Sequence, residues 1–234
     1  FSSLLYKNLS QKTGNLLYGQ AAVKPLQWKQ HLQKQETEAV FMKTYTIIRR
    51  PAELHWQDVP ALQVDECLWL PPADISMQAQ VCYDDAALYV RLSVREQNIR
   101  AEHKTPGCMV CEDSCMEFFI QPNINDKRYF NFELNPIGTL HLAIGRSRYD
   151  RRYIDFNKSD FDIKSDISNG IWSLTFKIPF DFINKHTGIT PICRANFYKC
   201  GDKTGHEHYC VWNTVETPTP DFHQSEFFGE LKFE

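Results

Sequence analysis

The stretches CMEFFI at residues 115–120 and YFNFELN at residues 129–135 decide the fold class of this 234-residue chain. Successive side chains of a β-strand point to opposite faces of a sheet, so residues two apart share a face. In the second stretch the two phenylalanines and the leucine therefore share one face, and the two asparagines and Glu133 share the other. The first stretch places its methionine, one phenylalanine and its isoleucine together, with Glu117 on the opposite side.

Pairing of these two strands would create a sheet with two different faces. One face would be an apolar layer directed toward a core, and the other would carry carboxylate and amide groups. Such a face presents hydrogen-bonding groups to a polar, uncharged ligand from a rigid support.

The bulk composition fits one soluble globule rich in strands. Hydrophobic residues make up 42% of the chain and aromatic residues 13%. The net charge is −3 with acids and bases interspersed, which argues against nucleic-acid and membrane-surface partners. The one basic cluster, residues 146–152, has acidic neighbours and is interpreted as a solvated loop. No apolar run approaches the ~20 residues of a membrane span. We expect a monomer or a weak dimer.

The eight cysteines bear on the compartment. No charged start followed by an apolar run marks a secretory signal, which favours reduced thiols in the cytoplasm. Because the chain starts at Phe1 rather than at a methionine, an upstream signal could have been removed, and the protein would then be extracellular.

The chain divides into two parts by composition. Residues 1–41 are rich in Gln, Lys and Leu, with an amphipathic helix predicted over 25–39, and are interpreted as an N-terminal extension before Met42. Residues 42–234 alternate between short strands and turns, with one short helix at 179–185 that begins with proline. The main predicted strands are 76–83, 88–94, 115–121, 128–135, 139–145, 172–178, 194–200, 208–213 and 229–233. About ten short strands with almost no helix predict an all-β protein, an antiparallel β-sandwich.

The order of these segments resembles carbohydrate-binding module family 9, over about residues 61–233. No single motif carries the resemblance; the ordered set does. The landmarks are Tyr83-Asp84-Asp85, Leu88-Tyr89-Val90, residues 113–119, residues 132–135 with Gly138, Trp172 leading to Ile178-Pro179, residues 196–198, Val211-Trp212 and residues 227–231.

The resemblance implies a β-sandwich of the carbohydrate-binding-module or immunoglobulin-like jelly-roll type that binds sugars without catalysis. In the family two tryptophans clamp a sugar ring, helped by a carboxylate, an arginine and amides, and structural calcium ions also occur. The family positions correspond here to Glu117 for the carboxylate, Glu133 for the arginine, Asn131 for an amide, Tyr198 for a glutamine, and Phe222 and Val110 for the two clamping aromatics.

The predicted ligand site consists of Glu117, Asn131, Glu133, Tyr198, Phe222 and His223, and its predicted ligand is a mono- or oligosaccharide. Carboxylates and amides satisfy sugar hydroxyls through charge-assisted or bidentate hydrogen bonds. An aromatic ring on a proline-stiffened loop, as Phe222 is, suits stacking on a sugar. The alternative is an ordinary solvated sheet face, with Phe222 packed under the edge of the sandwich.

Two other functions remain open at this point. Glu117 and Glu133 on neighbouring strands would have the spacing of the paired carboxylates of a glycoside-processing enzyme. A structural domain that has lost sugar binding is also compatible, because Val110 and Glu133 depart from the family pattern.

Metal binding is a further open question. Cys108, Cys111 and Cys115, with His103, invite a zinc interpretation, as does a second group formed by Cys200, His206, His208 and Cys210. Ordinary thiols are the alternative, because one CxxC pair is a weak signal. Structural calcium could be held by the oxygen-rich turns at residues 84–85 and 123–126, which are otherwise ordinary turns.

Overall fold

The computed structural model describes residues 42–71 and 74–234. The predicted extension and its helix over 25–39 lie outside these residues. The strands are β1 Thr44–Arg49, β2 Leu62–Val64, β3 Glu66–Cys67, β4 Ser76–Tyr83, β5 Ala87–Arg95, β6 Cys115–Gln121, β7 Tyr129–Leu134, β8 Leu140–Ser147, β9 Asp150–Tyr153, β10 Lys164–Ser168, β11 Ile171–Pro179, β12 Ile192–Cys200, β13 Tyr209–Val211 and β14 Gly229–Phe233. Helix α2 spans Phe180–His186. Among these described residues no helix is both long and apolar enough to cross a membrane.

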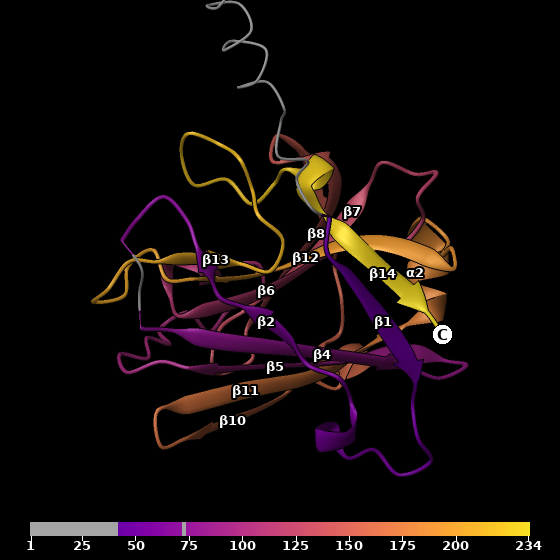
Figure 1. Cartoon of the computed structure of the whole chain (residues 1–234), viewed down its shortest axis with the longest axis horizontal. Helices are drawn as coiled ribbons and strands as arrows, with labels where there is room; N and C mark the ends of the chain where they lie inside the picture. Colours follow the sequence, from indigo (N-terminus) through magenta and orange to yellow (C-terminus); the bar gives the residue numbers. More distant parts are fainter. Residues whose placement is uncertain (1–41, 72–73) are drawn as a thin grey trace, which may run out of the picture. The chain divides into compact units, whose positions relative to one another are not determined.

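The strands form two sheets that share β1. A long sheet has the order β9-β8-β7-β6-β12-β14-β1, with β13 on the same edge of β12 as β14 and β3 beyond β13. A short sheet has the order β1-β4-β5-β11-β10, with β2 also paired to β4. Figure 1 shows β1 and β14 side by side, and β4, β5, β11 and β10 stacked in sequence.

Strand β1 belongs to both sheets and connects them. Its first part, Thr44–Ile47, pairs with β14, and Ile48 and Arg49 pair with β4. Both pairings are parallel, whereas all other strand pairs of the described chain are antiparallel. The predicted β-sandwich is therefore confirmed, as a mixed rather than a purely antiparallel one.

The core between the sheets confirms the alternation predicted for β6 and β7. Their inner side chains, Met116, Phe118, Ile120, Phe130, Phe132 and Leu134, are all fully buried in one hydrophobic cluster. Phe118 stacks on Phe197 of β12 with ring centroids 4.6 Å apart. From the short sheet, Trp172 and Leu174 of β11 pack into the same cluster.

The opposite face of the long sheet is also covered. A second hydrophobic cluster lies on it, and includes Phe119, Tyr129, Tyr198 and Phe222. The polar residues of this face are therefore buried rather than open to solvent, which alternation alone did not indicate. The basic stretch 146–152 is also not simply a solvated loop, because residues 150–153 form strand β9 at the edge of the long sheet.

Removal of the Phe118 ring should cost much of the stability of the sandwich. Phe118→Ala leaves a cavity at the centre of the core, and such changes cost about 3–5 kcal/mol of unfolding free energy. Chemical denaturation of the variant and the wild type measures the difference. The matched control is Ile167→Ala on β10, where the side chain is 49% exposed, and its effect should stay within about 0.5 kcal/mol. Equal effects of the two substitutions would contradict this account of the core.

Candidate functional site

Four polar side chains lie in one row across the long sheet. Tyr198 of β12 is opposite Glu117 of β6, Glu117 is opposite Glu133 of β7, and Glu133 is opposite His141 of β8. Directly opposed residues have Cβ atoms about 5 Å apart and point to the same face. The sheet register therefore brings two carboxyl groups and an imidazole together on the outer face.

This row borders a cavity of about 170 Å³. The cavity is lined by Met109, Cys111, Glu117, Glu133, His141, Arg148, Arg151, Cys200, Asp202, Tyr209, Pro220, Asp221, Phe222 and His223. Of the six residues predicted for the site, four line the cavity. The other two, Asn131 and Tyr198, are completely buried and do not line it.

Glu117 is a buried acid without a cationic partner among the described residues. Its side chain accepts a hydrogen bond from the Cys200 thiol, with Sγ and Oε1 3.1 Å apart. Burial, followed by the charge of Glu133, raises the pKa of Glu117 well above its ordinary value. A protonated carboxyl can donate one hydrogen bond and accept others, which suits hydroxyl groups.

Glu133 is held in place from two sides. The Asn131 amide donates to its Oε1 at 2.7 Å, and the Arg151 guanidinium lies 3.8 Å from the same oxygen. Asn131 therefore orients Glu133 from the adjacent position on the same face of β7. Asn131 does not itself line the cavity.

His223 is a neutral imidazole with a defined tautomer. Arg151 lies 2.6 Å from Nε2, and because a guanidinium only donates, Nε2 accepts. Nδ1 therefore carries the proton and donates to the Tyr129 hydroxyl oxygen at 2.9 Å. Burial and the nearby charges of Arg151 and Arg148 lower the pKa of His223 to about 3.

Phe222 packs against the sheet and lines the cavity at the same time. Its ring stacks on Tyr198 with centroids 4.1 Å apart, and its carbonyl accepts from the Tyr198 hydroxyl at 3.0 Å. Next to it, Asp221 accepts hydrogen bonds from Arg148 and from the His223 backbone. Val110, at the second clamping position, is fully buried. Of the two clamping positions, only Phe222 therefore carries an aromatic ring that lines the cavity.

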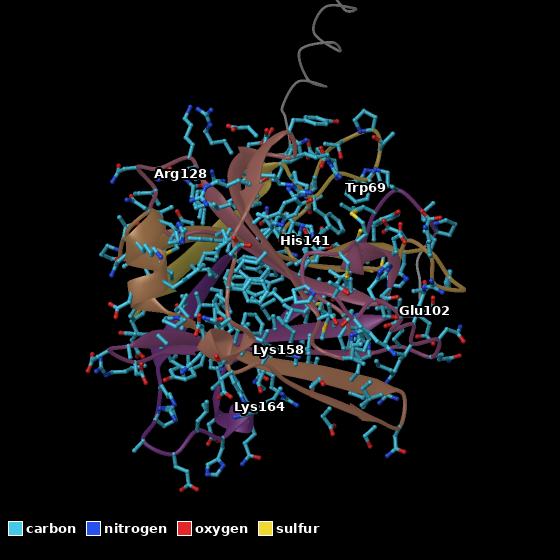
Figure 2. All side chains as sticks on the ribbon, turned by 180° about the vertical axis from the view of Figure 1, so that it is seen from behind. Trp69, Glu102, Arg128, His141, Lys158 and Lys164 are labelled. Atoms are coloured by element: carbon cyan, nitrogen blue, oxygen red, sulfur yellow. A yellow bond between two sulfur atoms is a disulfide. The ribbon has the colours of Figure 1, made fainter. Side chains whose placement is uncertain are left out.

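His141 is the clearest residue that the sequence analysis missed, and it lies near the centre of the view in Figure 2. Its Nδ1 donates to the Cys108 carbonyl at 3.0 Å, while its buried Nε2 has no hydrogen-bond partner among the described residues. The alternation of side chains along the strand predicted at 139–145 could have identified His141, because His141 lies in the same row as Glu133. The cysteines, arginines and aspartates of the cavity come from separate loops and strands, and no sequence spacing signals their meeting.

The two turns proposed for calcium do not fit a calcium site. Asp84 already accepts from two backbone amides and the Tyr89 hydroxyl. Asp126 is bonded by both the backbone and the guanidinium of Arg128. Calcium requires six to eight oxygen ligands. In these turns the Asp84 and Asp126 carboxylates already accept hydrogen bonds from donors of the chain itself.

The cysteines also group differently from either zinc prediction. Cys210 forms a disulfide with Cys67, so it does not join His206 and His208. His208 instead accepts from buried Lys199 at 2.7 Å. Cys115 of the first group lies opposite Cys200 of the second, across β6 and β12. The disulfide corrects the expectation that all thiols are reduced.

Comparison with known proteins assigns the fold and the family. The model of the family described as carbohydrate-binding family 9 matches residues 46–233. The chain belongs to this family. No curated protein sequence is significantly similar to it.

Solved structures share the fold at low sequence identity. A provisionally assigned carbohydrate-binding protein from Bacteroides uniformis is 24% identical, with a TM-score of 0.74 over 82% of this chain and 100% of its own. A family 9 module from Caldicellulosiruptor kristjanssonii in complex with cellotriose is 12% identical, with a TM-score of 0.58 over 82% of this chain and 94% of its own. The complex with glucose gives 13% identity and the same TM-score, over 82% and 96% of the two chains.

The buried neutral state of His223 predicts a specific loss of stability in acid. In the unfolded chain the imidazole binds a proton near pH 6.5, and in the folded chain only near pH 3. The stabilising contribution is therefore complete above pH 6.5 and falls toward pH 3, with a limiting slope of ~1.4 kcal/mol per pH unit. Denaturation of the wild type and of His223→Gln across this range measures it. The variant should show the shallower slope, and parallel curves would refute the assignment.

Proposed function

We propose that this domain binds a saccharide, without catalysis, in the cavity bordered by Glu117, Glu133, His141 and His223. The observation that carries the proposal is the sheet register, which places two carboxyl groups and an imidazole on one face beside this cavity. Membership of carbohydrate-binding family 9 supports the same function. So do the structural relatives that hold cellotriose and glucose.

The chemistry of the lining suits a neutral, hydroxyl-rich ligand. Carboxyl oxygens can accept hydrogen bonds from sugar hydroxyls, and Arg151 and a protonated Glu117 can donate to them. Phe222 adds an apolar edge for the C–H groups of a sugar ring. Asn131 and Tyr198, which were predicted as direct contacts, are better described as supports for Glu133 and Phe222.

The size of the cavity favours a small ligand. Its volume of about 170 Å³ is below the ~300–1,000 Å³ of pockets that enclose drug-sized molecules. We therefore favour a monosaccharide or the end of an oligosaccharide over an internal segment of a polymer. A monomer or weak dimer, as predicted from the sequence, would leave this site accessible.

Replacement of Glu117 tests the site. Glu117→Gln keeps the size of the side chain but removes the carboxyl group, and a hydrogen bond of a neutral group contributes about 0.5–1.5 kcal/mol. Affinity for the best ligand from a glycan array should therefore fall about 2- to 10-fold in titration calorimetry. Glu53→Gln, at an exposed position outside the cavity, is the matched control and should leave affinity unchanged. Equal affinity in both variants would sink the assignment of Glu117.

The same glycan panel separates binding from hydrolysis. Glu117 and Glu133 are directly opposed, and the raised pKa of Glu117 is a property that a general acid needs. An enzyme would cleave a member of the panel and lose turnover in Glu117→Gln. Binding without turnover supports the module, and a panel without binding supports a structural domain that has lost its ligand.

The compartment forms a separate part of the proposal. Six of the eight cysteines are unpaired, which favours the cytoplasm predicted from the sequence, whereas the Cys67–Cys210 disulfide is typical of an oxidising compartment. We keep the cytoplasm as the proposed compartment. Fractionation of the native host, followed by immunodetection, should find the protein in the cytoplasmic fraction. Recovery outside the cell would overturn this assignment.

A further inference from the structure

Two thiols and a carboxyl group meet beside the cavity. Cys115 and Glu117 are two residues apart on β6 and share its outer face, and Cys200 on β12 is the direct cross-strand neighbour of Cys115. One ligand atom from each of the three lies within 4.8 Å of the others. All three residues are buried, with exposures of 3% or less. Among the described residues this is the one group of its kind.

This geometry matches a first coordination shell for a soft or borderline cation. Zinc binds thiolate sulfur at about 2.3 Å and carboxylate oxygen at about 2.0–2.2 Å. In a tetrahedron these bond lengths separate neighbouring ligand atoms by roughly 3.3–3.8 Å. The observed 3.1 Å between the Cys200 sulfur and the Glu117 oxygen needs only a small adjustment to meet that spacing.

Acidic residues outnumber arginines around the same cavity. Four acidic residues line the cavity, and Arg148 pairs with Asp221 while Arg151 approaches Glu133. Glu117 and Asp202 have no ion-pair partner among the residues that the structure describes. A divalent cation would replace the protons of Glu117 and the two thiols and would supply the positive charge that their ionised forms need when buried.

Two further potential metal ligands lie around the same cavity. The Cys111 thiol lines it and interacts with the Asp202 carboxyl group. The Nε2 atom of His141 is buried without a partner, although it belongs to a residue that also lines the cavity. A histidine whose Nδ1 is fixed on a backbone carbonyl presents its other nitrogen in the form that metals bind.

We propose that Cys115, Glu117 and Cys200 form a site for one divalent metal ion of the zinc class. Because Glu117 and Cys200 also line the cavity, the remaining coordination position opens into it and is available to water or to a ligand hydroxyl. Cys115 belongs to the first cysteine group of the sequence and Cys200 to the second. They meet because the first residue of β6 lies opposite the last residue of β12. The site does not depend on sugar binding, but it shares Glu117 with the proposed saccharide site.

Zinc binding by the reduced full chain tests the proposal. Competition with a chromophoric chelator should give one zinc per chain, and cobalt(II) should show the charge-transfer absorption of a thiolate complex. Loss of a hydrogen-bond partner that orients a metal ligand already lowers the affinity for the metal 10- to 100-fold. Cys115→Ser and Cys200→Ser should therefore each weaken zinc binding by at least about 100-fold.

The matched control is Cys193→Ser, which alters a fully buried cysteine in the core between the sheets. It should bind zinc as the wild type does, and thermal unfolding of all three variants checks that they are folded. Absence of zinc binding by the reduced wild type would overturn the proposal. So would unchanged binding in the Cys115→Ser, Cys200→Ser double variant.

The saccharide site is tested separately, in buffer with and without a metal chelator. Sugar binding that survives chelation, together with zinc binding that requires both cysteines, supports two independent uses of the cavity. Zinc binding without any sugar binding supports the metal site and removes the proposed function. Sugar binding without zinc binding supports the proposed function and overturns the metal site.

Discussion

The pairing of β6 with β7 on one side and β12 on the other is the constraint on which the other features depend. Its register fixes the neighbours of every residue from Cys115 to Gln121. A shift of one residue would turn Phe118 outward and bring Glu117 into the core. The stacking of Phe118 on Phe197 and the burial of the inner side chains oppose that shift. The apolar core therefore also holds the carboxyl groups in their row.

A second hydrophobic layer changes the chemistry of that row. Loops carrying Val110 and Phe222 cover the outer face of the long sheet, so the polar groups there are buried and interact at low effective dielectric. Under these conditions the pKa of Glu117 rises and that of His223 falls. Burial thus favours the uncharged form of both groups. Neutral donors and acceptors in a small cavity suit a ligand with hydroxyl groups, which is the argument for a saccharide.

The same enclosure is compatible with both proposed ligands, a sugar and a metal ion. Glu117 accepts a hydrogen bond from the Cys200 thiol and forms no ion pair among the described residues. A hydroxyl group can hydrogen-bond to the protonated acid, whereas a metal ion would replace the protons of both groups. The family assignment supports the first use, and the arrangement of Cys115, Glu117 and Cys200 supports the second.

The sequence by itself determined most of the long strands, their inner and outer faces and the resemblance to the family. The alternation in 115–121 and 129–135 is strong because each apolar face must be buried, and the structure has β6 and β7 at those places. It also placed Glu117 and Glu133 on one face, since parity alone decides this once the strands pair. The mixed pairing of β1 was not apparent, because pairing direction leaves no local pattern.

Only the tertiary structure decided what surrounds those two acids. His141, Arg151 and Cys200 reach the cavity from β8, β9 and β12, and their approach depends on strand order rather than on spacing along the chain. Cys67 and Cys210 pair across 143 residues, which no local motif could indicate. Burial of the polar row likewise arises from loops that fold over it from distant parts of the sequence. Local residue pattern sets which way a side chain points, whereas long-range packing sets what it meets.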